Sequence, residues 1–472
     1  MFVQQFFVKG LAHSSYLLGG EDTCAIVDPS RDIDRYLEAA KDMGMKITHI
    51  LETHLHADFI SGHMDLAEAT GAVIYAPKSA RCQFRHKALS EGDTFRIENM
   101  RFRVIETPGH TPEHISYIVT DTSRGSEPAA VFCGDTLFVG DVGRPDLFPG
   151  KAEFLANQLY DSLHNKLLKL PDFCDVYPAH GAGSLCGRAM GAKRTSTIGY
   201  ERRYNSALQI ADRDAFIRSL TTNMPAAPDH FSRCSAINGK GPALARTLPV
   251  IQPMSPPEFR KAAKKKNTIL LDIRSYDAFG GQHVPGSYHI DFGGNFSTFA
   301  GWILPPDQNI LLVADSPDEA CEAGILLKRV GLDKTVGYLE GGMFAWAAGG
   351  FPTGHVPQIS ADELNAIMAK GKGLALVDVR ASGEFEANHI EGAVNISAPD
   401  LRTRRDRLKK SVPYALICST GHRSSLASSL LKQRGFEDVR NVAGGMTGYS
   451  AAGYSAECPI CVAPHLPQTG WK

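Results

Sequence analysis

Two histidines and an aspartate lie close together in the segment 53–58, which reads Thr-His-Leu-His-Ala-Asp. The segment follows an apolar run, 47–51, that predicts a β-strand. Side chains two residues apart on an extended chain point the same way, so His54 and His56 can face one ion, with Asp58 beside them. Proteins use imidazole and carboxylate groups to bind zinc and iron. A polar surface loop is the plain alternative, and it gives no reason for this spacing.

Three further polar residues share this layout, each just past an apolar run and beside a glycine or a proline. His110 follows the run 103–107, Asp135 follows 129–133, and His180 follows 174–177. Glycine and proline permit the sharp turn that ends a strand. A single histidine at a strand end is more often structural, but four strand ends of one kind indicate a common edge. The sequence therefore predicts one metal site there.

A second reactive group is Cys418, which follows the apolar run 414–417 and precedes a helical pattern that begins near Ser424. This arrangement places the sulfur at a helix N-terminus, where backbone N–H groups and the helix dipole favour a thiolate. A thiolate attacks sulfane sulfur, and the same N–H groups can hold the resulting persulfide. We therefore predict sulfur transfer at Cys418, with His422 beside it and Arg423 placed to attract an anion such as sulfite.

Three other side chains are weaker candidates for a role at the metal site. Cys186 follows His180 closely, so it could relay sulfur there or could simply be a small buried thiol. Arg202 and Arg203 could hold an anionic carrier such as glutathione or coenzyme A, although charged helix faces are usually only solvated. The residues alone leave both questions open.

The elements that carry these groups fall into three parts. Strand-like runs alternate with short helical patterns up to about residue 220, and a proline-rich stretch follows. Beyond it, Leu-Leu-Asp-Ile-Arg at 270–274 matches Leu-Val-Asp-Val-Arg at 376–380, about a hundred residues later, which indicates a duplicated domain. Both copies alternate short apolar strands with helices, so we predict an α/β fold with parallel sheets. We expect three domains, at 1–245, 252–352 and 356–457.

The overall composition excludes several classes of protein. The chain has 472 residues, of which 50 are basic and 51 acidic, so no net field would gather nucleic acid or an acidic membrane. No apolar run approaches the roughly 20 residues of a membrane span. Ten cysteines in so long a chain do not form a disulfide framework, and the lone pair Cys458 and Cys461 is a weak signal for metal or redox chemistry. We expect a cytoplasmic protein.

The first part resembles the metallo-β-lactamase fold, in its glyoxalase II and persulfide dioxygenase branch. The resemblance covers about 1–220 and implies an αββα sandwich. In persulfide dioxygenases a single iron(II) is held by two histidines and one carboxylate, and the matching residues are His54, His110 and Asp135. The other three motif residues would then orient these ligands or bind metal more weakly: His56, Asp58 and His180. Phe59 stands where the family often has another histidine, which leaves one good site.

The duplicated part resembles the rhodanese, or sulfurtransferase, domain. Cys418 and Arg423 have the spacing of its catalytic loop, and the resemblance to an active copy runs over about 356–455. The first copy, about 252–352, keeps the frame, but its equivalent strand ends in Asp315 and no cysteine stands there. Cys321 lies inside the following helix and is a poor substitute. The first copy is therefore expected to be catalytically inactive.

Together the resemblances imply a persulfide dioxygenase–rhodanese fusion that detoxifies sulfide. Such a protein would oxidise a low-molecular-weight persulfide with O2 to sulfite, and would form thiosulfate by sulfur transfer. One alternative is a zinc thioester hydrolase of the glyoxalase II type, although nothing here resembles that enzyme's helical C-terminal domain. Another is a non-catalytic sulfur carrier. The carrier thiol, iron or zinc, and the direction of sulfur flow stay open, and a homodimer is only a general expectation for such enzymes.

Overall fold

The protein is described from a computed structural model that covers residues 1–222, 224, 226–371, 373–404 and 407–454. Cys458 and Cys461 lie outside these residues. The chain folds as two compact units. One unit comprises 1–250 together with 294–307 and 324–334, and the other comprises 251–293, 308–323 and the chain from 335 onward.

Two six-stranded sheets form the frame of the first unit. The first sheet has the order β1-β2-β3-β4-β5-β6, with bounds Phe2–Val8, His13–Gly19, Thr23–Val27, Lys46–Leu51, Val73–Pro77 and Lys87–Leu89. The second has the order β12-β11-β10-β9-β8-β7, with bounds Ser196–Thr197, Asp175–Pro178, Ala130–Gly134, Ile115–Asp121, Met100–Glu106 and Thr94–Ile97. Their facing sides share one core, in which Tyr16 and Leu18 pack with Phe102 and Phe132.

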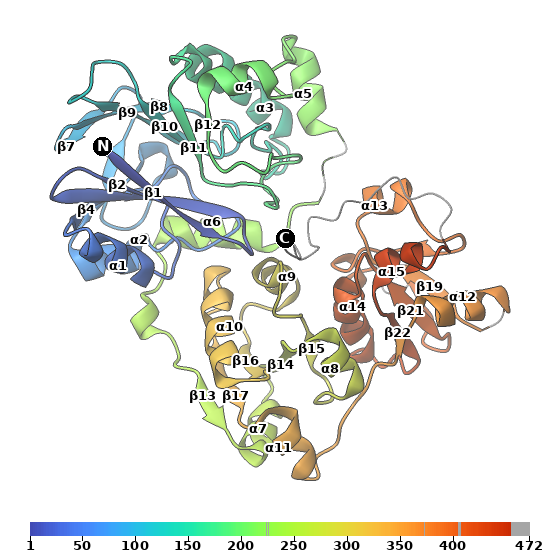
Figure 1. Cartoon of the computed structure of the whole chain (residues 1–472). Coiled ribbons are helices and arrows are strands. Elements are labelled where there is room, and N and C mark those ends of the chain that lie inside the picture. The colour runs from blue at the N-terminus through green and yellow to red at the C-terminus, as the bar shows by residue number, and fades with distance from the viewer. Residues whose placement is uncertain (223, 225, 372, 405–406, 455–472) are drawn as a thin grey trace, which may run out of the picture. The chain divides into compact units, whose positions relative to one another are not determined.

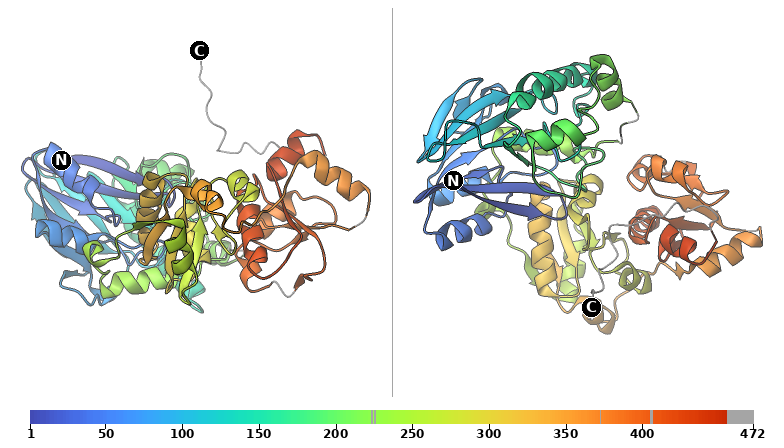
Figure 2. Two further views of the ribbon diagram at one scale, coloured as in Figure 1. Left: turned by 90° about the horizontal axis from the view of Figure 1, so that it is seen from below. Right: turned by 45° about the horizontal axis from the view of Figure 1, so that its top comes forward.

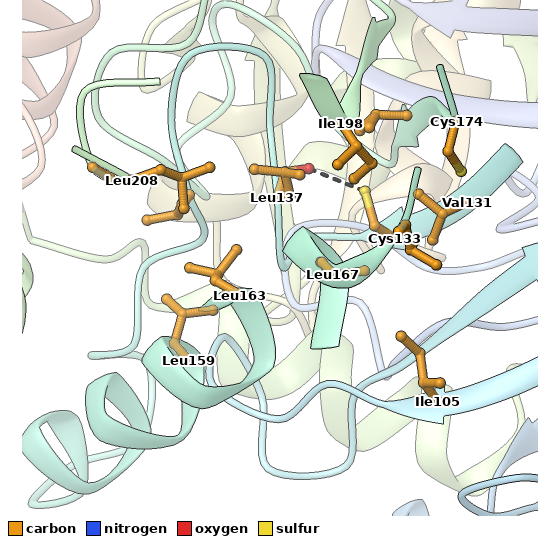
Figure 3. Packing of buried hydrophobic residues seen from close by; sticks show 14 of the residues in the cluster. Ile105, Val131, Cys133, Leu137, Leu159, Leu163, Leu167, Cys174, Ile198 and Leu208 are labelled. Carbon is orange, nitrogen blue, oxygen red and sulfur yellow. Dashed lines mark hydrogen bonds between the residues drawn. The ribbon is translucent and has the colours of Figure 1, made fainter. Parts of the chain in front are cut away.

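Helices cover the outer side of each sheet, as Figure 1 shows. Tyr36 from α1 (Asp34–Asp42) and Leu66 from α2 (His63–Thr70) are buried against the first sheet. Behind the second sheet, Leu159 from α3 (Ala152–Asp161) belongs to the same buried cluster as Val131 and Cys133 of β10, and Figure 3 shows this cluster. The helices α4 (Ile198–Tyr204), α5 (Arg213–Thr221) and α6 (His230–Lys240) follow. The predicted αββα sandwich is confirmed.

Each repeat of the C-terminal half has a five-stranded sheet with all strand pairs parallel. The first has the order β13-β17-β16-β14-β15, with bounds Gln252–Met254, Thr335–Leu339, Asn309–Val313, Thr268–Asp272 and Tyr288–His289. The second has the order β18-β22-β21-β19-β20, with bounds Gln358–Ile359, Val439–Val442, Tyr414–Ile417, Ala375–Asp378 and Val394–Asn395. The identical order confirms the predicted duplication and the parallel α/β fold.

The helices of the two repeats also correspond. The first repeat has α7 (Pro256–Ala263), α8 (Tyr276–Gly281), α9 (Phe296–Ile303), α10 (Pro317–Arg329) and α11 (Gly342–Ala348). The second has α12 (Ala361–Ala369), α13 (Ser382–Ala387), α14 (His422–Lys432) and α15 (Gly445–Ala451). Its orange to red ribbon in Figures 1 and 2 has helices on both sides of the sheet. The central strands β16 and β21 are almost wholly apolar and buried, as parallel strands covered on both faces require.

Candidate metal centre and sulfur-transfer loop

Three predicted ligands come together at the ends of three strands of the first unit. His54 follows β4, His110 follows β8, and Asp135 follows β10, and all three side chains are fully buried. One ligand atom from each lies within 4.8 Å of the other two. Asp135 Oδ2 is 3.3 Å from His110 Nε2 and 3.8 Å from His54 Nε2. Two imidazoles and a carboxylate in this arrangement form a metal-binding site on one side of an ion.

Hydrogen bonds fix which nitrogen of each ring faces the centre. Thr53 Oγ1 donates to Asp28 Oδ2 at 2.9 Å, so it accepts from His54 Nδ1, also at 2.9 Å. His110 Nδ1 donates to the backbone carbonyl of Arg144 at 2.9 Å. Both rings therefore carry their proton on Nδ1, and each Nε2 is buried with no hydrogen-bond partner. A pair of unprotonated nitrogens beside a carboxylate fits a metal ion.

The charges of these groups agree with that assignment. Burial lowers the pKa of His54 well below its usual range, and the neighbouring His56 and His114 lower it further. Burial also lowers the pKa of His110. Burial alone would raise the pKa of Asp135, but His180, His110 and His54 hold it well below its usual range. Two neutral imidazoles and one carboxylate are thus ready to bind a cation.

A second group lies beside the first and consists of Asp58, His180 and Cys186. His180 donates from Nδ1 to Asp135 at 2.7 Å, and its Nε2 is 2.8 Å from Asp58 Oδ2. Burial alone would lower the pKa of His180, but Asp135 and Asp58 hold it well above its usual range. Burial raises the pKa of Cys186 well above its usual range, and Asp58 and Asp135 add to the effect. Cys186 is therefore a buried thiol close to the predicted ligands.

His56 falls in a different group of possible ligands from His54, although their ring centroids are 4.1 Å apart, and the expectation that both face one ion stays a prediction. Strand β4 ends at Leu51, so the alternation of an extended chain does not continue through the motif. The third group of possible ligands is instead His56, Asp28 and Glu52, with His56 Nε2 3.2 Å from Asp28 Oδ1. Burial raises the pKa of Glu52 to about 8.

The sequence patterns missed two histidines of this centre. His13 is fully buried at the start of β2, with neither ring nitrogen hydrogen-bonded, and its ring centroid is 4.0 Å from that of Phe59. It forms an isolated backbone bridge with His180. His114 accepts a hydrogen bond from the backbone N–H of Asp135 at 3.0 Å. Both lie at the beginnings of strands, and the pattern used for the prediction, a polar residue just after an apolar run, does not detect residues there.

The two arginines predicted to bind substrate lie on α4. The guanidinium of Arg202 donates to the backbone carbonyls of Leu168 and Leu170 and pairs with Asp172, so its donors already have partners. Arg203 is exposed. A substrate-binding role for these two residues stays a prediction. The hydrogen bonds and ion pair of Arg202 favour a structural role for that residue.

Cys418 lies between β21 and α14, as predicted. The backbone N–H of Gly421 and the hydroxyl of Ser424 donate to its sulfur at 3.1 and 3.3 Å. Gly445 approaches the same loop so closely that a Cβ there would lie 2.3 Å from the Cys418 carbonyl oxygen. A glycine is therefore required at Gly445. The loop cradles the sulfur with donors, which is what a thiolate or a persulfide needs.

Arg423 is held by neighbours of the loop. Its guanidinium donates two hydrogen bonds to Glu384 of α13, at 2.6 and 2.7 Å, and one to Ser419 at 2.8 Å. These bonds give Arg423 a part in shaping the loop, and its attraction of an anion stays a prediction. Sequence spacing could not reveal this partner, which is 39 residues away.

The first repeat contributes to the surroundings of this loop. His422 donates from Nδ1 to Asp291 Oδ2 at 2.9 Å, and its ring meets that of Tyr276 edge-on, with centroids 5.1 Å apart. At its own equivalent loop, the first repeat has Asp315, whose backbone N–H donates to Glu319. Cys321 is exposed on α10, inside the helix as predicted.

Comparison with known proteins identifies the families. Residues 8–180 match the metallo-β-lactamase superfamily. A hydroxyacylglutathione hydrolase of Pseudomonas aeruginosa (strain LESB58) is 30% identical over 214 residues, which are 45% of this chain and 78% of that protein. The chain belongs to the metallo-β-lactamase superfamily. Residues 255–349 and 360–452 match the rhodanese-like domain, so this superfamily member carries two rhodanese-like domains.

Relatives of two activities resemble the N-terminal part of this superfamily member. The persulfide dioxygenase ETHE1 of Mus musculus is 29% identical over 215 residues, 44% of this chain and 76% of that protein. The hydroxyacylglutathione hydrolase of Rhodospirillum rubrum is 42% identical over 159 residues, 33% of this chain, and the chain spans only 57% of its length. A crystal structure of a metallo-β-lactamase from Staphylococcus aureus subsp. aureus COL is 35% identical, with a TM-score of 0.66, and the match covers 71% of this chain and 98% of that one.

Two other expectations from the sequence concern the whole chain. Within the described residues, no helix is long and apolar enough to cross a membrane. The domain limits 1–245, 252–352 and 356–457 remain predictions.

Proposed function

We propose that this protein is a persulfide dioxygenase with a sulfurtransferase domain. The N-terminal site would oxidise a low-molecular-weight persulfide with O2 to sulfite, and Cys418 would transfer sulfane sulfur to form thiosulfate. The observation that carries the proposal is the presence, on one chain, of a two-histidine, one-carboxylate site and a loop built to hold sulfane sulfur.

The residues of the first site suit a single iron(II) ion, with zinc as the alternative. His54, His110 and Asp135 would hold it, because their Nε2 atoms and carboxylate converge and the two nitrogens lack other partners. Phe59 packs 4.4 Å from His56, centroid to centroid, and offers no ligand for a second ion. A bound iron(II) would supply the oxidation in which a persulfide, O2 and water become a thiol and sulfite.

The chain's own side chains would bind and orient the persulfide. An apolar cluster of Ala57, Phe138, Cys186 and Phe231 is buried, and Cys186 also belongs to the second ligand group. These side chains would exclude water from the sulfur atoms. In this proposal Cys186 contacts the terminal sulfur and can relay it, while Asp58 and His180 orient the ligands.

At the second site, the Cys418 thiolate would attack the outer sulfur of a persulfide. The S–S bond breaks and the carrier thiol leaves with the electron pair, so Cys418 becomes a persulfide held by Gly421 N–H and Ser424 Oγ. Sulfite then attacks the outer sulfur, thiosulfate leaves, and the Cys418 thiolate returns. Arg423 keeps the loop in shape through Glu384.

A thioester hydrolase is the second candidate, because hydroxyacylglutathione hydrolases are among the more similar relatives of the N-terminal part. Oxygen uptake separates the two. Iron-reconstituted protein should consume O2 on addition of glutathione persulfide or coenzyme A persulfide, and should release sulfite or thiosulfate. Protein with a full complement of metal that consumes no O2, but hydrolyses S-lactoylglutathione, would establish the hydrolase instead.

A further inference from the structure

We infer that the first rhodanese-like repeat, which has lost its cysteine, braces the metal loop of the N-terminal domain. The brace is the segment 324–334, which contains the end of α10, and the metal loop is 52–62, which carries His54, His56 and Asp58. Both segments belong to one compact unit. The inference rests on the metal-binding site, and it holds whether that site oxidises persulfides or hydrolyses thioesters.

The end of α10 fits a socket made by the N-terminal domain. The last carbonyl groups of a helix have no partner within it and must be satisfied from outside. Here the carbonyl of Lys328 accepts from Arg31 at 2.9 Å, that of Arg329 accepts from the Ile60 backbone N–H at 2.6 Å, and that of Val330 accepts from Arg233 at 3.0 Å. Two guanidinium groups also suit the negative end of the helix dipole.

Two ion pairs join the segment 324–334 to the N-terminal domain at the same place. Arg31 donates to the carboxylate of Asp333 at 2.6 Å, and the neighbouring Asp32 accepts two hydrogen bonds from Arg329, both at 2.7 Å. The Arg31 side chain is only 3% exposed. Burial alone would raise the pKa of Asp32, but the guanidinium of Arg329 lowers it. Paired, buried and bidentate charges of this kind hold two segments in one register.

The bond to Ile60 reaches the metal loop two residues after Asp58. The same loop is also held from α6, where the buried side chain of Asn238 donates to the carbonyls of His56 and Phe59, both at 2.8 Å, and accepts from the N–H of Ser61 at 2.9 Å. Asn238 belongs to α6 of the N-terminal domain, so the loop is held by that domain as well as by the end of α10. Without the brace, the Ile60 N–H would lose its partner and the loop would be free to shift its ligands.

The active repeat shows that a rhodanese helix does not need this docking. The helix that corresponds to α10 is α14, which ends at Lys432. Its end is satisfied locally, because the N–H of Gly435 donates to the Lys432 carbonyl and Lys432 Nζ donates to the carbonyl of Glu437. The end of α10 has the equivalent local bond, from the Gly331 N–H to the Lys328 carbonyl at 3.1 Å, so its contacts with the N-terminal domain come in addition to that bond. The socket of α10 therefore serves the N-terminal domain and not the rhodanese fold.

Loss of the brace is tested with R329Q and D32N in the full-length, zinc-loaded protein. Zinc transfer to a chromogenic chelator gives the rate of metal release, and hydrogen exchange of a peptide covering 54–66 reports the loop directly. Each variant should release zinc about ten-fold faster, as loss of an outer contact to a metal site commonly does. The Ile60 region should exchange faster, while sulfur transfer by Cys418 stays at the wild-type rate.

R213Q is the matched control, because Arg213 also forms a two-bonded pair with an aspartate, Asp161, but between α3 and α5. It should release zinc at the wild-type rate. If R329Q does not fold, D333N replaces it, since Arg31 then keeps its two carbonyl bonds. Zinc release and loop exchange at wild-type rates in R329Q or D333N, or an equal increase in R213Q, would overturn the inference.

Discussion

One hydroxyl group, that of Thr53, decides how His54 faces the metal. It has a single proton, which it gives to Asp28, so it must accept from His54 Nδ1 and leave Nε2 bare. Asp28 also accepts from the Thr53 backbone N–H at 2.8 Å and has a left-handed backbone, with φ of 49°. Non-glycine residues pay for this conformation and keep it where the surroundings require it. Asp28 thus orients a ligand that it does not touch.

Replacing Thr53 by valine keeps the shape of the side chain and removes the hydroxyl. We expect T53V to lower zinc affinity by about ten-fold or more, because the His54 ring loses its orientation and its fixed tautomer. Competition with a chelator of known affinity measures this. T48V is the control, since Thr48 makes the same contact with the next residue, His49, at 2.8 Å but outside the three groups of possible ligands. Equal affinity in T53V and T48V would rule out the role of Thr53.

The ends of the strands could be predicted from the sequence, and most of the candidate ligands lie just after them. The runs 103–107 and 129–133 correspond to β8 and β10, and the C-terminal end of each strand lies one residue from the end of its run. This was enough to bring His110 and Asp135 together, because β8 and β10 are both antiparallel to β9, so they run in the same direction and end at the same edge of the sheet. The orientation of His56 could not be predicted in this way, because it depends on Asp28, which is far away in the sequence.

Contacts between the two repeats also could not be predicted from the sequence. The predicted neighbour of Cys418, His422, is bound by Asp291 of the first repeat, and no local pattern connects residues 131 positions apart. The hydrogen bond and charge of Asp291 raise the pKa of His422, and Asp277 adds to the effect. Burial alone would raise the pKa of Asp291, but His422 lowers it. The pair is therefore ionised over a wider pH range than either group alone.

The stability that this pair contributes should depend on pH. The His422 share is complete below the unfolded pKa of about 6.5 and is lost as pH rises through the raised folded pKa. The Asp291 share is complete above about pH 4 and is lost as pH falls through the lowered folded pKa. Melting temperatures of wild type and D291N should therefore differ most between about pH 4 and 6.5 and converge above neutrality.

An exposed pair without histidine provides the comparison. Asp438 pairs with Arg440 in the second repeat. The difference in melting temperature between D438N and wild type should stay constant between about pH 5 and 8, because no group of that pair titrates there. If the difference in melting temperature between D291N and wild type were also constant over this range, His422 would not be the group whose titration weakens the pair.

At the scale of the whole molecule, the fusion places the metal site and Cys418 on one chain, and the proposed function gives them a shared intermediate. In the proposed reaction, sulfite made at the metal centre is the acceptor of the sulfur carried by Cys418. When the linker permits contact, the effective concentration of one tethered site at the other is about millimolar. This is far above the concentration of a separate enzyme present at micromolar levels in solution. The benefit of fusion should therefore be a short lifetime of free sulfite.

Two full-length variants test this benefit, because each keeps one site. C418S should stop sulfur transfer and leave oxygen uptake largely intact, and H110A should do the reverse. Wild type supplied with glutathione persulfide and O2 should form thiosulfate with little free sulfite. An equimolar micromolar mixture of C418S and H110A should accumulate sulfite first, because the sulfite must diffuse to another chain, and its thiosulfate yield should rise with protein concentration. Identical time courses for the mixture and the wild type would mean that the fusion gives no kinetic coupling. Loss of both activities in C418S alone would contradict separate sites.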